Sequence, residues 1–320
     1  MAIFRLQITS LGRAQGRRAT SSAAYRAGER IRDERSGRIY DHTERTDVRH
    51  SEIVLPAELA GQEMGWARDR ATLWNAAEHA ESRANARVAR EFQVGLPHEL
   101  SEPARVALAQ KFAHQMADRY HTVVDLTVHD PRPEGSQRNY HAHLLATTRE
   151  ATPSGLGRKA QSELNETRRK ERGLPRSSAE FVELRARWAE LTNESLRTAG
   201  VDARVDHRSL RAQGIDREPV PQLPTPAFRA ERRGESSEIA ERIRQRYQER
   251  VAARSAGRDL AKEAAAEWKR IRDNSRGQQV RTPELAKTAV EEWRKWKSQE
   301  RPETLDRKPE RSLEYDAGLG

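Results

Sequence analysis

Cysteine is absent from this 320-residue chain, and aromatic residues make up only 5% of it. Without cysteine the chain has no disulfide and no thiolate metal site, which is typical of proteins of a reducing compartment. Long apolar runs are also missing, and the first residues lack the apolar core of a signal peptide. We therefore expect a cytoplasmic protein with no membrane insertion.

Basic residues are in excess over acidic ones. The chain has 59 lysines and arginines against 49 aspartates and glutamates, which gives a formal net charge of +10. Such an excess favours a polyanionic partner. Because no amphipathic anchor or lipidation signal accompanies it, nucleic acid is a better candidate than a membrane surface.

The spacing of apolar residues predicts short strands alternating with helices. Strands are expected at residues 4–8, 52–56, 91–97, 123–128, 139–145 and 201–207, and helices at 20–31, 58–89, 106–116 and 178–196. The polar, basic stretch at 149–176 is expected to be a mobile loop. Short strands that are partly linked as hairpins indicate an α+β fold, with an antiparallel central sheet and flanking helices.

Composition divides the chain into three parts. Residues 1–220 carry the periodic apolar pattern and form the predicted folded domain. Residues 221–235 contain several prolines and are interpreted as a linker. Residues 236–320 are densely charged with few large apolar side chains, so we expect a helical or disordered tail without a core of its own.

Three histidines form the most informative pattern in the sequence. His141 and His143 are two residues apart in an apolar run, so in a strand their side chains share one face of the sheet. His129 ends the preceding apolar run, and the segment between the runs is rich in turn-forming residues. A hairpin would bring His129 beside the other two, where three imidazoles can converge on one divalent metal ion.

Other interpretations of the histidines remain open. A histidine on a strand is commonly a hydrogen-bonded side chain with no ligand, and ten histidines produce some close pairs by chance. A structural zinc site would need a fourth protein ligand, often cysteine. Three nitrogen ligands with open positions suit a catalytic metal better.

Two further residues are candidates for chemistry. Tyr25 lies on a short predicted helix among small residues, so its phenol could project freely. Taken alone, a tyrosine in this position is more often a half-buried aromatic that anchors the helix. Glu91 begins a predicted strand, where an isolated glutamate is ordinarily solvated.

Four ordered motifs resemble the MobA/MobL family of plasmid mobilisation relaxases, of the HUH endonuclease class and single-tyrosine MobQ type. The resemblance covers about residues 1–220 and rests on residues 23–29 (AAYRAGE), 90–97 (REFQVGLP), His129 with 139–144 (NYHAHL), and 206–216 (DHRSLRAQGID).

The resemblance implies a function and roles for the candidate residues. It makes Tyr25 the nucleophile, assigns His129, His141 and His143 to a divalent metal such as Mg²⁺ or Mn²⁺, and places Glu91 near that metal. It implies metal-dependent, site- and strand-specific nicking and rejoining of DNA at a plasmid transfer origin through a 5′-phosphotyrosyl intermediate. Expected partners are single-stranded or supercoiled plasmid DNA, accessory mobilisation proteins and a type IV secretion coupling protein.

Three alternatives differ in what they do to DNA. A rolling-circle replication initiator would use the same chemistry at a replication origin. A basic DNA-binding accessory protein with a structural metal would form no covalent adduct. A nuclease that activates water in place of tyrosine would leave both DNA ends free.

Overall fold

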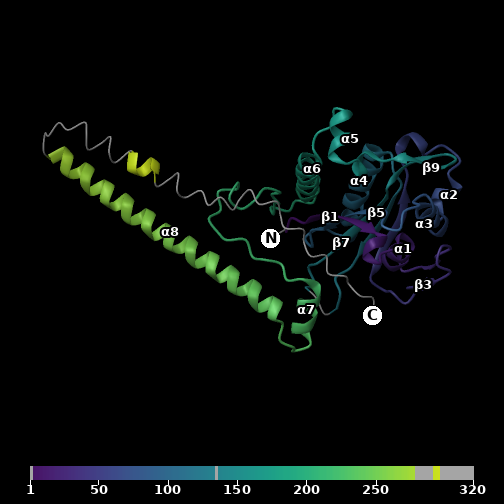
Figure 1. Ribbon diagram of the computed structural model, residues 1–320, viewed down its shortest axis with the longest axis horizontal. Coiled ribbons are helices and arrows are strands. Elements are labelled where there is room, and N and C mark those ends of the chain that lie inside the picture. The colour runs from purple at the N-terminus through teal and green to yellow at the C-terminus, as the bar shows by residue number, and fades with distance from the viewer. Residues whose placement is uncertain (1–2, 134–135, 278–290, 296–320) are drawn as a thin grey trace. The chain divides into compact units, whose positions relative to one another are not determined.

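The computed structural model describes residues 3–133, 136–277 and 291–295, and it divides into two compact units, Met1–Ser209 and Leu210–Gly320 (Figure 1). The first unit is built on a five-stranded sheet with the order β1-β5-β7-β6-β4. Its strands are β1 (Leu6–Gly12), β4 (Val48–Val54), β5 (Arg87–Gly95), β6 (Val124–His129) and β7 (His141–Thr147). All neighbouring pairs are antiparallel, which confirms the predicted fold class.

Helices cover both faces of this sheet (Figure 1). One face packs against α4 (Glu102–Tyr120) and α6 (Ser177–Thr198) through a core that includes Phe92, Phe112, Leu126, Leu144 and Trp188. The opposite face packs against α1 (Ala19–Ala27), α2 (Gly65–Arg68) and α3 (Arg70–His79) through a core that includes Leu11, Leu73, Trp74, Val88 and Leu145. Because side chains alternate along a strand, the histidines of β7 share the second face with Leu145.

A buried ion pair joins α3 to the centre of the sheet. Arg70 Nε donates to Asp125 Oδ2 over 2.9 Å, and Trp74 Nε1 donates to the same oxygen over 2.8 Å. Asp125 is 3% exposed, so both donors are needed to offset the cost of removing its charge from water. This pairing fixes α3 on the face of β6 that also carries His129.

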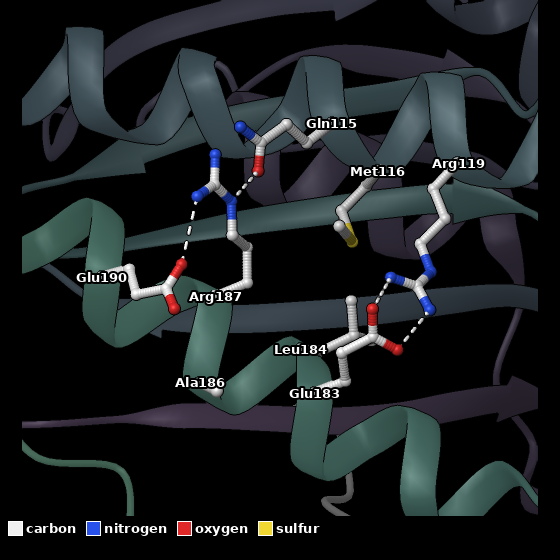
Figure 2. Close-up of a pocket in the computed structure, with 8 residues that line it drawn as sticks. All are labelled: Gln115, Met116, Arg119, Glu183, Leu184, Ala186, Arg187 and Glu190. Atoms are coloured by element: carbon white, nitrogen blue, oxygen red, sulfur yellow. Dashed lines mark hydrogen bonds and ion pairs between the residues drawn. The ribbon is translucent and has the colours of Figure 1, made fainter.

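The outer surfaces of α4 and α6 are held together across a shallow groove (Figure 2). Arg119 bonds to both oxygens of Glu183, at 3.0 and 2.9 Å, and Arg187 Nε donates to Gln115 Oε1 over 3.0 Å. Beneath these polar bridges lies Met116, which is 2% exposed. The lining residues all belong to α4 or α6, on the face of the sheet opposite the histidines.

The expected mobile loop at residues 149–176 is wrong. This segment folds into the hairpin β8 (Arg149–Thr152) and β9 (Gly155–Lys159), followed by η3 (Gln161–Glu163) and α5 (Glu166–Glu171). Several of its basic residues are paired: Arg149 and Lys159 both contact Glu81, and the buried Arg169 donates to Glu180 over 2.7 Å. Both acidic partners lie outside the segment, so its own composition resembled that of a solvated loop.

Two other predicted elements differ from the structure. The predicted strand at 201–207 is wrong: these residues join no sheet, and the Asn193 side chain bonds both to the amide of Val205 (2.8 Å) and to its carbonyl (2.9 Å). The predicted helix at 58–89 is broken into η2 (Ala57–Leu59), α2 and α3, and Asp69 caps α3 by accepting from Thr72 N.

The first helix ends earlier than its predicted limit. Gly28 adopts a left-handed φ of 67° just after α1, a conformation that favours glycine and ends helices. The chain then forms a small hairpin of β2 (Arg30–Arg32) and β3 (Ile39–Asp41) that the sequence did not predict. A 3-10 turn, η1 (Arg13–Gln15), precedes α1.

The second unit contains α7 (Thr225–Arg232) and the 40-residue helix α8 (Glu238–Gly277). Exposed ion pairs connect α8 to the chain before it, as in Arg250–Glu218 and Arg254–Asp216. Residues 278–290 and 296–320 of the predicted tail lie outside the described residues. Among the helices that the structure describes, none is long and apolar enough to span a bilayer.

Candidate metal centre and nucleophile

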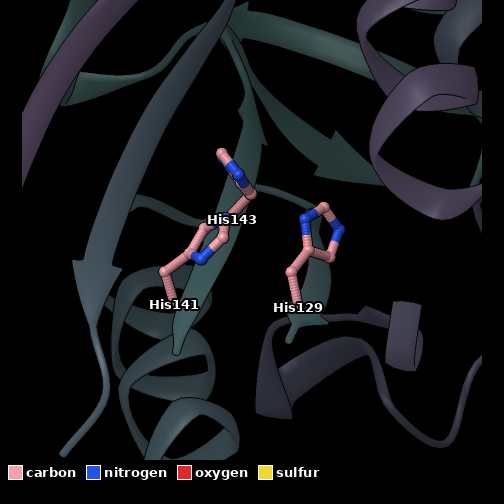
Figure 3. A group of neighbouring side chains, drawn as sticks. All are labelled: His129, His141 and His143. Atoms are coloured by element: carbon pink, nitrogen blue, oxygen red, sulfur yellow. The ribbon is translucent and has the colours of Figure 1, made fainter. Parts of the chain in front are cut away.

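His129, His141 and His143 converge on the sheet face covered by α1 and α3 (Figure 3). β6 and β7 pair so that His129 stands opposite His141, and His143 follows two residues along β7. One ring nitrogen from each residue can be chosen so that all three lie within 4.8 Å of one another. The hairpin therefore produces the cluster that the sequence pattern predicted.

Each imidazole is oriented by a hydrogen bond from one of its ring nitrogens. His129 Nε2 lies 2.7 Å from the carbonyl oxygen of Arg26, His141 Nδ1 lies 2.9 Å from that of Asn139, and His143 Nδ1 lies 2.5 Å from Glu91 Oε1. All three partners are acceptors, so the bonded nitrogen must be the protonated one. The second nitrogen of each ring keeps its lone pair, as a metal ligand requires.

The rings are held in the neutral form. Burial lowers the pKa of His129 to about 3 and that of His141 to about 4. Burial also lowers the pKa of His143, although Glu91 acts in the opposite direction. At neutral pH the three imidazoles are therefore uncharged donors, and no proton has to be displaced before a cation binds.

Glu91 lies on β5 beside the cluster, and both of its carboxylate oxygens accept hydrogen bonds. Oε1 accepts from His143 and from Arg26 Nε (2.6 Å), while Oε2 accepts from Thr9 over 3.4 Å. Burial alone would raise the pKa of Glu91, but Arg26 and His143 hold that pKa below its ordinary value. The carboxylate is thus a permanent anion that orients His143.

Tyr25 lies on α1, one residue before the carbonyl that binds His129. Its Oη accepts a hydrogen bond from Arg132 Nη2 over 2.6 Å. The ring meets the edge of His42 with centroids 5.2 Å apart, and the guanidinium of Arg45 stands 4.2 Å from the ring centroid. Helix α1 therefore places the phenol in a cationic environment and is bonded directly to the histidine cluster.

Sequence reasoning missed the three arginines of this site. Arg26 bonds to Glu91, Arg45 covers the Tyr25 ring, and Arg132 reaches its oxygen. Arg26 directly follows Tyr25, so its i+1 position was visible but gave no sign of a partner 65 residues away. Arg132 lies in the hairpin loop between His129 and His141. This position is the one sequence signal that could have pointed to a role at the site.

Residues 17–233 match the model of the MobA/MobL family. The chain is similar to the mobilization protein MobL of Acidithiobacillus ferridurans, with 38% identity over 74% of this chain and 66% of that protein. It is also similar to a probable mobilization protein MobA of Bifidobacterium longum, with 30% identity over 74% of this chain and 46% of that protein. The chain thus spans less than two thirds of the length of these curated relatives.

A solved structure is similar in fold to this chain. It comes from work on the molecular basis of vancomycin resistance transfer in Staphylococcus aureus and is 30% identical, with a TM-score of 0.53. The match covers 65% of this chain and all of that one.

Proposed function

This chain belongs to the MobA/MobL family, and we propose that it nicks and rejoins one DNA strand at a plasmid transfer origin through a 5′-phosphotyrosyl intermediate. In this proposal Tyr25 is the nucleophile and His129, His141 and His143 hold a divalent cation, Mg²⁺ or Mn²⁺. The observation that carries it is the bond from His129 to the carbonyl of Arg26, because it ties the metal-binding face to the helix of the nucleophile.

The donor set fits a divalent cation that is to keep its charge. Three neutral imidazoles add no negative charge, whereas carboxylate ligands would cancel part of the positive charge of the ion. When bound, the cation supplies Lewis-acid polarisation of the scissile phosphate. Glu91 contributes from behind, since its hydrogen bond fixes the ring of His143 and raises the basicity of that ligand.

The chemical step is a transesterification. Tyr25 Oη attacks the phosphorus in line, the Oη–P bond forms and the P–O3′ bond breaks. The phenol loses its proton and the departing O3′ gains one, so the products are a 5′-phosphotyrosyl protein and a free 3′-hydroxyl. Arg132 donates to the attacking oxygen and stabilises negative charge that develops there. The bond energy is conserved, and the reverse attack by a 3′-hydroxyl reseals the strand without ATP.

Glu91 has a positioning role in this proposal. Its two oxygens already accept from His143, Arg26 and Thr9, so it acts on the cluster through the ring of His143. In this proposal Glu91 is neither the nucleophile nor a metal ligand.

The wider setting of the reaction follows from the same proposal. The excess of positive charge suits supercoiled or single-stranded plasmid DNA as the substrate. Delivery of the covalently bound strand requires accessory mobilisation proteins and a type IV secretion coupling protein in the bacterial cytoplasm.

Denaturing electrophoresis tests the proposal. We would incubate the protein with Mg²⁺ or Mn²⁺ and a supercoiled plasmid that carries the cognate transfer origin. The expected result is a protein-linked strand with wild type and none with Tyr25→Phe, while Tyr25→Phe still binds origin DNA. The matched control Tyr40→Phe retains the adduct. A Tyr25→Phe protein that still forms the adduct would disprove the nucleophile, and free ends with wild type would indicate attack by water.

A further inference from the structure

We propose that Arg45, held by Asp47, is a positioning residue that sets the Tyr25 ring for attack. The inference deepens the proposed function and rests on it. It starts from one guanidinium that contacts the face of the Tyr25 ring and the backbone of the same residue.

The nitrogens of Arg45 are committed to this arrangement. Nη1 donates to the carbonyl oxygen of Tyr25 over 2.6 Å, Nε donates to Asp47 Oδ1 over 2.9 Å, and Nη2 donates to Asp47 Oδ2 over 2.5 Å. The side chain of Arg45 is only 13% exposed. A bidentate carboxylate fixes the plane of a guanidinium. The plane of Arg45 in turn limits where the Tyr25 ring can lie.

A second side of the ring is closed by His42. The two rings meet edge to face, with an interplanar angle of 88°. His42, Arg45 and Asp47 all belong to the loop between β3 and β4, so one short segment contacts the ring from two directions. A phenol enclosed in this way has few orientations, and orientation is a large part of the rate of an in-line displacement.

Gly28 lies where this loop packs against the end of α1. A Cβ at this position would come 3.5 Å from Arg45 Cβ, 3.6 Å from the carbonyl oxygen of His42 and 3.4 Å from a methyl of Val48. The residue also has a φ of 67°, which side chains rarely adopt. The loop therefore packs at van der Waals distance against the helix terminus, and the backbone conformation at Gly28, more than the space around it, favours glycine.

The same loop is bonded to the strand that carries a histidine of the cluster. The carbonyl oxygen of Asp47 accepts from the amide of Asp130 over 2.9 Å, and Val48 pairs with His129 across β4 and β6. The orientation of the nucleophile and the position of one metal ligand thus share a backbone frame. Arg45 is the side chain that connects this frame to the reacting ring.

Direct binding of DNA phosphate is the main competing role for an arginine near a nuclease site. It fits Arg45 less well, because the fork of this guanidinium is already paired with a carboxylate and its charge is balanced. The guanidinium cation is also attracted electrostatically to the face of the aromatic ring, and this attraction grows as negative charge develops on the phenol. The contacts therefore favour action on Tyr25.

Single-turnover cleavage of an end-labelled oligonucleotide that carries the cognate nick site tests the inference. We expect Arg45→Met to slow adduct formation at saturating DNA by roughly 10- to 100-fold, the range for a misplaced reacting group. The half-saturating DNA concentration should stay within about twofold of wild type, as a residue acting on orientation requires. Arg45→Lys restores the charge without the fork and should recover part of the rate. Asp47→Asn should slow the reaction in the same direction.

Arg30→Met is the matched control, because Arg30 is also paired with an aspartate, Asp41, but on the exposed β2–β3 hairpin. Equal cleavage rates for Arg45→Met and Arg30→Met would overturn the inference. So would a weaker DNA affinity with an unchanged saturated rate, which would assign Arg45 to phosphate binding. If Arg45→Met fails to fold, Arg45→Lys and Asp47→Asn decide the matter by the same rates. A wild-type protein that forms no adduct would refute the proposed function itself.

Discussion

His143 and Glu91 are joined by a hydrogen bond of 2.5 Å, from one ring nitrogen to a carboxylate oxygen buried behind it. The bond crosses from β7 to β5, and Glu91 is held from its other side by Arg26. A carboxylate in this position selects the tautomer in which the other ring nitrogen of His143 carries a lone pair. Glu91, which lies outside the histidine cluster, therefore determines the tautomer and the orientation of one of the three rings.

The first prediction concerns this carboxylate. Glu91→Gln keeps the shape of the side chain but removes the charge, so it should weaken binding of Mn²⁺ by about 10- to 100-fold, the usual effect of losing such an outer partner. Isothermal titration with Mn²⁺ measures the change. Glu58→Gln is the matched control, because Glu58 also accepts from a histidine, His121, but at an exposed position. Unchanged affinity in Glu91→Gln would show that the ring is fixed by packing alone.

The second prediction concerns the cluster itself. His141→Ala removes one of three nitrogens, and the remaining pair should not retain a stoichiometric ion. Native mass spectrometry after exposure to Mn²⁺ should show one ion per wild-type chain and a loss of most of it in the variant. His79→Ala, at an exposed position on α3, should keep the ion. Equal occupancy in the two variants would remove the proposed site.

The third prediction is a pH dependence of stability in the metal-free protein. An unfolded histidine takes up a proton near pH 6.5, whereas the folded His141 does so only near pH 4 and His129 near pH 3. Between these limits the unfolded state binds more protons, so the free energy of unfolding should fall as the pH is lowered from about 6.5 towards 4.

Thermal unfolding between pH 7.5 and 4.5 measures this trend, with chelator present throughout. His129→Gln removes one titrating group and should flatten the decline, while the exposed His79→Gln should follow wild type. A decline in His129→Gln that is as steep as in wild type would assign the acid sensitivity to other groups.

The fourth prediction concerns the buried pair below the site. Arg70→Met leaves Asp125 as a buried charge without its guanidinium partner, and breaking such a pair costs about 3–5 kcal/mol of unfolding free energy. Urea denaturation measures the loss. Arg158→Met, which removes the exposed pair with Glu150, should change stability by less than about 1 kcal/mol. Similar losses in the two variants would show that Asp125 is satisfied by Trp74 alone.

Local sequence patterns were sufficient for the existence of the five sheet strands and for the histidines. Alternating apolar residues predicted the first strand, apolar runs predicted β6 and β7, and the spacing of His141 and His143 predicted their common face. These features depend on neighbours along the chain or across a tight hairpin, so the local sequence pattern is enough to predict them. The position of His129 followed from the hairpin for the same reason.

The parts that could not be predicted depend on distant partners. Arg169 looked like one charge of a basic loop, and its burial against Glu180 became visible only in the fold. The segment at 201–207 has a strand pattern, but the side chain of Asn193 takes the hydrogen bonds that a neighbouring strand would have supplied. Arg45 lies 20 residues from Tyr25, and no pattern in the sequence relates the two.

The acceptor for His129 is a main-chain carbonyl, that of Arg26, and this has a consequence for how the site can fail. No side-chain substitution at position 26 deletes a carbonyl, so on the side of α1 the bond is broken by movement of the helix and not by the loss of a side chain. Under the proposed function, fraying of that helix would displace the Tyr25 phenol and remove the hydrogen bond that orients His129 in the same event. A partly melted molecule would then lose its nicking activity as a whole, and not one half of the site at a time.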